Sequence, residues 1–218
     1  MLVVLWSGAL AGLALFVVQR FTVIPLIETA ETYEASEHPV ATGNTHEEPG
    51  RPADDWKRTS LTALTTILSG MGFAALLFGS LSITGIRVNT RRGALWGLAA
   101  FACVGLAPAI GLPPQPPGVA VAGLYERQIW WVGTVAATAT GFWLLASKGR
   151  TWLLRVGGIA CLSLPHLIGA PAASGQNAVP PELIHRFTIA SLATTGIFWI
   201  LLGAVGGFVS SRMQADSR

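Results

Sequence analysis

The chain has 218 residues, of which 51% are hydrophobic and only 11% are charged. With a mean hydropathy of +0.55, it has too little polar surface for a soluble domain of this length. The composition therefore predicts an all-α fold, a polytopic membrane helix bundle in which residues 1–218 form a single transmembrane domain. The net charge of +3 comes from Lys and Arg between apolar segments rather than on one soluble face, so membrane lipid is an expected partner and nucleic acid is not.

Six apolar segments approach or exceed the roughly twenty residues that cross a bilayer core. They lie near residues 2–27, 60–83, 94–112, 129–147, 152–167 and 183–209. The fifth is the weakest, because Arg155 and Pro165-His166 interrupt it. We expect six transmembrane helices, with five as the alternative. No Lys or Arg precedes the first apolar run and no small-x-small pattern closes it, so a retained helix is expected rather than a cleaved signal peptide.

Three carboxylates follow the first apolar run. Glu28, Glu31 and Glu34 recur at i, i+3 and i+6, so they share nearly one face if the helix continues past Pro25. Like charges on one stripe repel, so the three are either solvated or offset by a cation or a basic side chain. Residues 34–58 then read as a polar external loop without apolar periodicity.

A rigid segment separates the third and fourth apolar runs. Pro113, Pro114, Pro116 and Pro117 cannot lie in a regular helix, because proline lacks the amide proton and restricts the preceding residue. Glu126-Arg127 and Trp130-Trp131 follow as a charge pair and an interfacial anchor. We predict structural charge pairing of Arg127 with Glu126, Glu28 or Glu31, since a lone guanidinium near lipid is costly.

Two histidines stand at the ends of the last two apolar runs. His166 closes the fifth run and His185 opens the sixth, and intramembrane ionisable residues are functional candidates. Each has a structural alternative as a capping or interfacial hydrogen-bonding group. If they act as ligands, Glu28, Glu31, His166 and His185 would converge as a metal site. Oxygen and nitrogen ligands without thiolate suit cobalt, nickel or zinc better than copper(I).

The distribution of basic residues predicts the orientation in the membrane. Lys and Arg favour cytoplasmic loops, and they occur after the second and fourth runs and in the tail: Arg87, Arg91, Arg92, Lys148, Arg150, Arg212 and Arg218. Both termini should then be cytoplasmic, with residues 28–55, 113–118 and 171–182 outside. Five basic residues on the outer side weaken this orientation, although the first three share a loop with many acids: Arg51, Lys57, Arg58, Arg127 and Arg186.

The motifs of nucleotide-driven and hydrolytic enzymes are missing from the sequence. It has no Gly-x-x-x-x-Gly-Lys-Ser/Thr loop, no dinucleotide fingerprint, no His-Glu-x-x-His and no Gly-x-Ser-x-Gly. We therefore expect no enzymatic activity and no organic cofactor.

Several segments together resemble the CbtA family of predicted cobalt transporter subunits of bacterial inner membranes. They are Val23–Glu34, Gly93–Gly97, Leu106–Pro114 with Pro117-Gly118, Arg127–Trp131, and Pro165–Pro171 followed by Pro180–Leu183. The resemblance covers nearly the whole chain in order. It implies cobalt(II) uptake with a small single-helix, His-containing CbtB-like subunit. The chain has Gln115 where an acidic residue is expected in the proline segment, so the resemblance implies no metal role for that position.

The sequence is compatible with two classes of function. The first is an inner-membrane subunit of a cobalt uptake transporter that captures the ion on the outer side. The second is an accessory or structural helix-bundle subunit of a larger membrane complex with no transport activity of its own. Apolar spans without carboxylates favour the second class.

Overall fold

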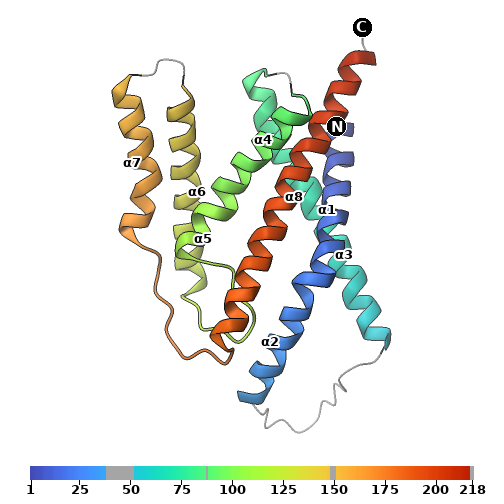
Figure 1. Cartoon of the computed structure of the whole chain (residues 1–218), viewed down its shortest axis with the longest axis vertical. Coiled ribbons are helices and arrows are strands. Elements are labelled where there is room, and N and C mark those ends of the chain that lie inside the picture. Colours follow the sequence, from blue (N-terminus) through green and yellow to red (C-terminus); the bar gives the residue numbers. More distant parts are fainter. Residues whose placement is uncertain (38–51, 87, 148–150, 217–218) are drawn as a thin grey trace.

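The fold is described by a computed structural model that covers residues 1–37, 52–86, 88–147 and 151–216. Within these residues every regular element is helical (Figure 1), which confirms the all-α prediction. In chain order the elements are α1 (Leu2–Thr22), α2 (Ile24–Glu37), α3 (Pro52–Thr84), α4 (Thr90–Phe101), the π-helix η1 (Ala102–Leu106), α5 (Ala107–Gly111), α6 (Leu124–Ala146), α7 (Trp152–Ile168) and α8 (Pro181–Asp216).

Among the described residues, five stretches of helix are long and apolar enough to cross a membrane. They are Leu2–Thr22, Trp56–Ile83, Thr90–Gly111, Leu124–Ala146 and Pro181–Ala215. The remaining apolar helix, α7, has only 17 residues. The segment that the sequence marks as weakest is therefore the short one, and the count of spans by length agrees with the alternative of five.

Both edges of the segment 34–58, expected as a polar loop, are helical, and residues 38–51 lie outside the described part of the chain. α2 continues to Glu37, and α3 begins at Pro52, where the missing amide proton costs nothing in the first helical turn. His38 and His46, which stand beside acidic residues in the sequence, lie outside the described residues. Val23 separates α1 from α2, so the first apolar run is interrupted just before Pro25.

Glycines allow the long helices to touch backbone to backbone. Gly8 and Gly12 of α1 lie against α3 at Gly70, and a side chain at Gly8 would meet the backbone of Met71. α4 and α8 approach in the same way, where a side chain at Gly203 would meet the carbonyl of Gly93. Close approach of this kind replaces the hydrophobic drive that helices lack inside lipid.

A buried cluster joins α1, α3 and α8. It contains Ala11, Ala74, Leu77, Leu81, Val88, Phe198, Trp199 and Leu202. Leu202 is fully buried, and Phe73 of α3 packs edge-on against Phe198. These helices form the main body of the molecule.

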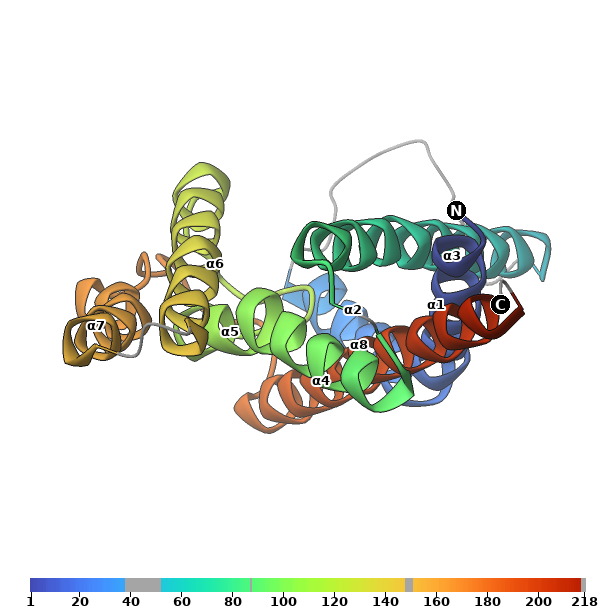
Figure 2. The same cartoon turned by 90° about the horizontal axis from the view of Figure 1, so that it is seen from above.

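The helices α6 and α7 form a second, peripheral pair. They pack on each other at Gly141 and Gly158, and α6 meets the main body through η1 and α5 (Figure 2). η1 arises just before Pro108, where Ala107 N–H bonds to the carbonyl of Ala102, five residues back, in a π-turn. Proline cannot donate in the regular ladder, so it favours such a local change of register.

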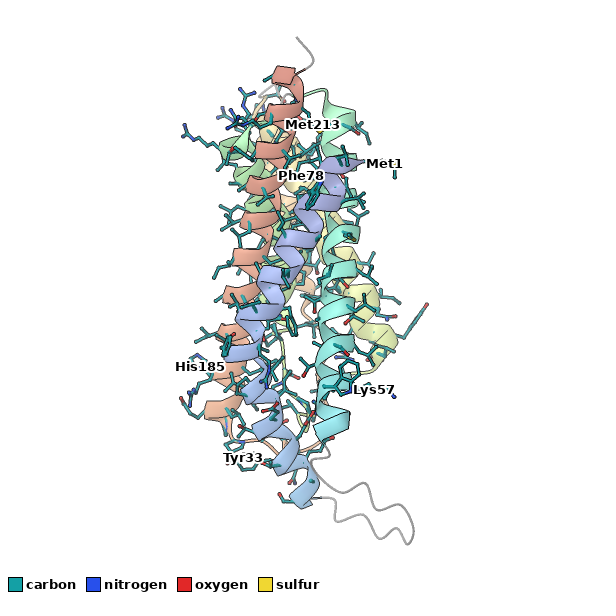
Figure 3. All side chains as sticks on the ribbon, turned by 90° about the vertical axis from the view of Figure 1, so that its right-hand side faces the viewer. Met1, Tyr33, Lys57, Phe78, His185 and Met213 are labelled. Atoms are coloured by element: carbon teal, nitrogen blue, oxygen red, sulfur yellow. The ribbon has the colours of Figure 1, made fainter. Side chains whose placement is uncertain are left out.

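The helix bundle has two ends, one that holds the chain termini and one that holds the candidate site residues of α2 and α8. Both termini lie at one end of the molecule, and the last turn of α2 and the connections after α5 and α7 lie toward the other (Figure 1). Figure 3 places Tyr33, Lys57 and His185 toward that second end, opposite Met1 and Met213. We call the second end the acidic end, because Glu28, Glu31, Glu34, Glu126 and Glu182 belong to it.

Candidate functional site

The three carboxylates of α2 do not share one environment. Ala30 turns inward and is fully buried against Val179 and Leu183, which fixes the rotation of α2 about its axis. Glu28 and Glu34 are exposed, whereas Glu31 is partly buried and faces α3. There the guanidinium of Arg58 donates to Glu31, with 2.8 Å between Nη2 and Oε1. Arg58 therefore compensates the negative charge of Glu31, the middle one of the three carboxylates.

The proline segment is held against the segment between α7 and α8 by two hydrogen bonds. Ala178 N–H donates to the carbonyl of Gly118 over 2.9 Å, and Ala120 N–H donates to Asn177 Oδ1 over 3.0 Å. Gly118 has a φ of +77°, and its α-carbon faces the Cβ of Glu34. A side chain there would be strained and crowded, so the glycine permits the close approach.

One hydroxyl fixes the proline segment to α8. Thr188 Oγ1 lies 2.8 Å from the carbonyl of Pro114 and 2.9 Å from that of Ile184, its own helical acceptor. The Pro114 carbonyl belongs to a stretch without regular secondary structure and needs a partner from elsewhere. At the acidic end, the proline segment, α2 and the start of α8 are therefore in contact with one another.

His166 lies near the end of α7 and faces α6. Its ring is 6.4 Å from that of Trp130, edge to face. His166 Nδ1 and Trp130 Nε1 are both buried, and neither has a hydrogen-bond partner in the described part of the chain. His166 therefore belongs to the contact between α6 and α7, away from the carboxylates of α2.

His185 lies in the second turn of α8, and its side chain is exposed. Within residues 1–37, 52–86, 88–147 and 151–216, no group of three or more His, Cys, Asp and Glu side chains is close enough to hold a metal ion. The structure thus does not bring Glu28, Glu31, His166 and His185 together as one ligand set among the described residues.

Arg127 lines a cavity of about 930 Å³ between the proline segment, α6 and the residues that follow α7. Its Nε is buried without a hydrogen-bond partner among the described residues, and no ion pair joins it to a described carboxylate. The predicted pairing with Glu28, Glu31 or Glu126 is therefore not seen. Glu31 has Arg58 instead, and Glu126 folds back over Gly123, where the helix begins.

Two residues of this end were missed by reasoning from the sequence alone. Arg58 belonged to a polar stretch with several acids and bases, so nothing in its spacing singled out Glu31 as its partner. Gln128 lines the cavity beside Arg127, and its position directly after Arg127 was the one available signal.

The family model described as "Probable cobalt transporter subunit (CbtA)" matches residues 1–211 of this chain. The chain belongs to the CbtA family. No curated protein and no solved structure matches it. Membership in the CbtA family confirms the resemblance found in the sequence, and it supports a role as a transporter subunit with cobalt as the transported ion. Together with its apolar helices, it makes this CbtA chain a membrane protein.

Proposed function

We propose that this chain is the inner-membrane subunit of a cobalt(II) uptake transporter and that it captures the ion at its acidic end. The observation that carries the proposal is the match of residues 1–211 to a family of probable cobalt transporter subunits. The proposal includes no catalytic step and no organic cofactor.

The charge distribution supports an outward orientation of the acidic end. The end that holds the termini carries Arg91, Arg92 and Arg212. Basic residues favour the cytoplasmic side, so both termini are proposed to be cytoplasmic and the acidic end to face outward. Carboxylates there would concentrate a divalent cation from the outside.

We propose that the ligands on this chain are Glu28, Glu31, His166 and His185. Carboxylate oxygen and neutral imidazole nitrogen suit cobalt(II). Because the four lie apart, binding requires either a rearrangement of the acidic end or ligands from a partner. A small single-helix, His-containing CbtB-like subunit would supply such ligands, and it would also serve the middle of the bundle, where the described spans carry no carboxylate.

The test is cobalt-57 uptake in cells that express this chain with its partner, combined with cobalt binding by the purified complex. The substitutions Glu28→Gln, Glu31→Gln, His166→Ala and His185→Ala are compared with Glu182→Gln, an exposed acid of the same end outside the proposed set. Loss of uptake and binding in the first group, with Glu182→Gln near the unsubstituted level, supports the proposal. Unchanged uptake and binding in both His166→Ala and His185→Ala contradicts the ligand assignment.

The alternative function is an accessory or structural subunit of a larger membrane complex. It is favoured by the missing group of three metal-binding side chains in the described ranges. Purification in mild detergent separates the two functions. A single-helix partner with bound cobalt supports transport, whereas a stable larger complex without metal supports the accessory role.

A further inference from the structure

The cavity beside Arg127 has a positive wall and an otherwise neutral lining. Arg127, Gln115 and Gln128 line it, and no Asp, Glu or His of the described residues does. A bare divalent cation would meet an uncompensated guanidinium there, so the cavity does not suit the transported ion. An anion would instead be attracted to it, and a planar guanidinium matches the oxygens of a phosphate or carboxylate with two parallel hydrogen bonds.

The state of Arg127 indicates that such an anion is needed. The side chain is partly buried, its Nε is enclosed, and in the described part of the chain neither a hydrogen bond nor an ion pair satisfies its guanidinium. A buried donor on a charged group is costly to leave without an acceptor. A ligand that accepts from the guanidinium would remove this cost.

The surroundings of the cavity are suited to an amphiphile. Prolines and alanines form most of its inner wall, and Trp131 and Val132 form a rim that is 41% and 58% exposed. Ile129 and Val132 continue this rim as an exposed apolar strip along α6, where acyl chains would lie. Arg127 is only the fourth residue of this span, which is the depth of a lipid headgroup, and tryptophan is enriched at the same depth.

We propose that this cavity binds the phosphodiester headgroup of an anionic phospholipid, with Arg127 on the phosphate and an acyl chain along α6. The lipid headgroup would fill the space between the proline segment and the residues that follow α7. The proposal does not depend on cobalt transport, because the cavity and the proposed metal ligands share no residue.

The test measures lipid binding by the purified full-length chain. Native mass spectrometry and thermal unfolding are followed during titration with phosphatidylglycerol or phosphatidylcholine. We expect preferential retention of phosphatidylglycerol and a raised unfolding temperature. Arg127→Gln should weaken its binding by roughly 10- to 100-fold, the equivalent of one charge-assisted hydrogen bond. Arg186→Gln removes an exposed charge of the same end that does not line the cavity, and should leave binding unchanged.

A second variant and a second ligand keep the test decisive. Arg127→Lys retains the positive charge but not the planar guanidinium that can donate two parallel hydrogen bonds. This variant should fold and bind the lipid with intermediate affinity, even if Arg127→Gln yields no folded protein. Lipid binding by Arg127→Lys equal to that of the unsubstituted chain overturns the proposal, and so does a loss of binding in Arg186→Gln equal to that in Arg127→Gln. It is also overturned if inorganic phosphate alone stabilises the chain as much as phosphatidylglycerol does, because the site would then take a free anion.

Discussion

Arg58 and Glu31, 27 residues apart in the sequence, form a two-pronged ion pair between α3 and α2. Arg58 Nη2 lies 2.8 Å from Glu31 Oε1, and Nη1 lies 3.4 Å from Oε2. This pair joins α2 to α3 at the acidic end. It also means that a proposed metal ligand already has a cationic partner, which an incoming ion must displace.

Arg58→Ala should therefore strengthen cobalt binding. Exposed ion pairs contribute about 0.2 to 1 kcal/mol, so freeing Glu31 should lower the dissociation constant by up to roughly fivefold. Isothermal titration calorimetry of the purified complex measures this, with Lys57→Ala as a matched control that removes a neighbouring charge. Weaker binding in Arg58→Ala alone would mean that the pair positions the carboxylate rather than competing for it.

Gly203→Ala should destabilise the contact between α4 and α8. The added methyl group would meet the carbonyl of Gly93, which is backbone and cannot turn aside. Overpacking costs about 1 to 3 kcal/mol, so the unfolding temperature in detergent should fall by several degrees. Gly133→Ala is the control, because the space beside Gly133 is open. Equal effects of the two substitutions would show that helix propensity, and not close packing, determines the response.

Thr188→Val should loosen the proline segment. It removes the hydrogen bond to Pro114 while keeping the shape of the side chain, at a cost of about 0.5 to 1.5 kcal/mol. Hydrogen exchange measured by mass spectrometry should become faster in a peptide spanning residues 112–124. Thr194→Val is the comparison, because both acceptors of Thr194 lie in its own helix. Unchanged exchange in Thr188→Val would show that other contacts hold the segment.

Cysteine labelling should place Gln176 and Ala215 on opposite sides of the membrane. Both residues are exposed, at opposite ends of the molecule. In a background without Cys103 and Cys161, Gln176→Cys should react with an impermeant maleimide in intact cells, and Ala215→Cys only after permeabilisation. Labelling of Ala215→Cys alone in intact cells would reverse the proposed orientation.

The helices could be predicted from the sequence because apolar runs of membrane length form a local signal. The bounds were less accurate where polar residues continue a helix beyond the bilayer, as α3 does from Pro52 to the first apolar turn. Hydropathy does not register such a helix, since its polar residues resemble those of a loop. The shortness of α7 was visible in advance because Arg155 and Pro165 limit its apolar length.

The acidic end was predictable in composition but not in its pairings. Spacing placed Glu28 and Glu31 near one face of a helix, and the structure agrees. Which base meets Glu31 depends on how α2 and α3 turn toward each other, and that rotation is set by the burial of Ala30 on α8. The position of His166 depends likewise on the packing of α7 against Trp130. Both are tertiary relationships that one sequence does not encode in its spacing.

The length of α7 has a consequence for the membrane itself. Its 17 residues extend about 26 Å at 1.5 Å per residue, whereas a hydrocarbon core is about 30 Å thick. The chain nevertheless returns through α7 and then through residues 169–180, which have no regular secondary structure and lead to the start of α8 (Figure 1). Hydrophobic mismatch of this kind is relieved by local thinning of the bilayer. The barrier that separates the two compartments should therefore be narrowest beside α7, next to His166.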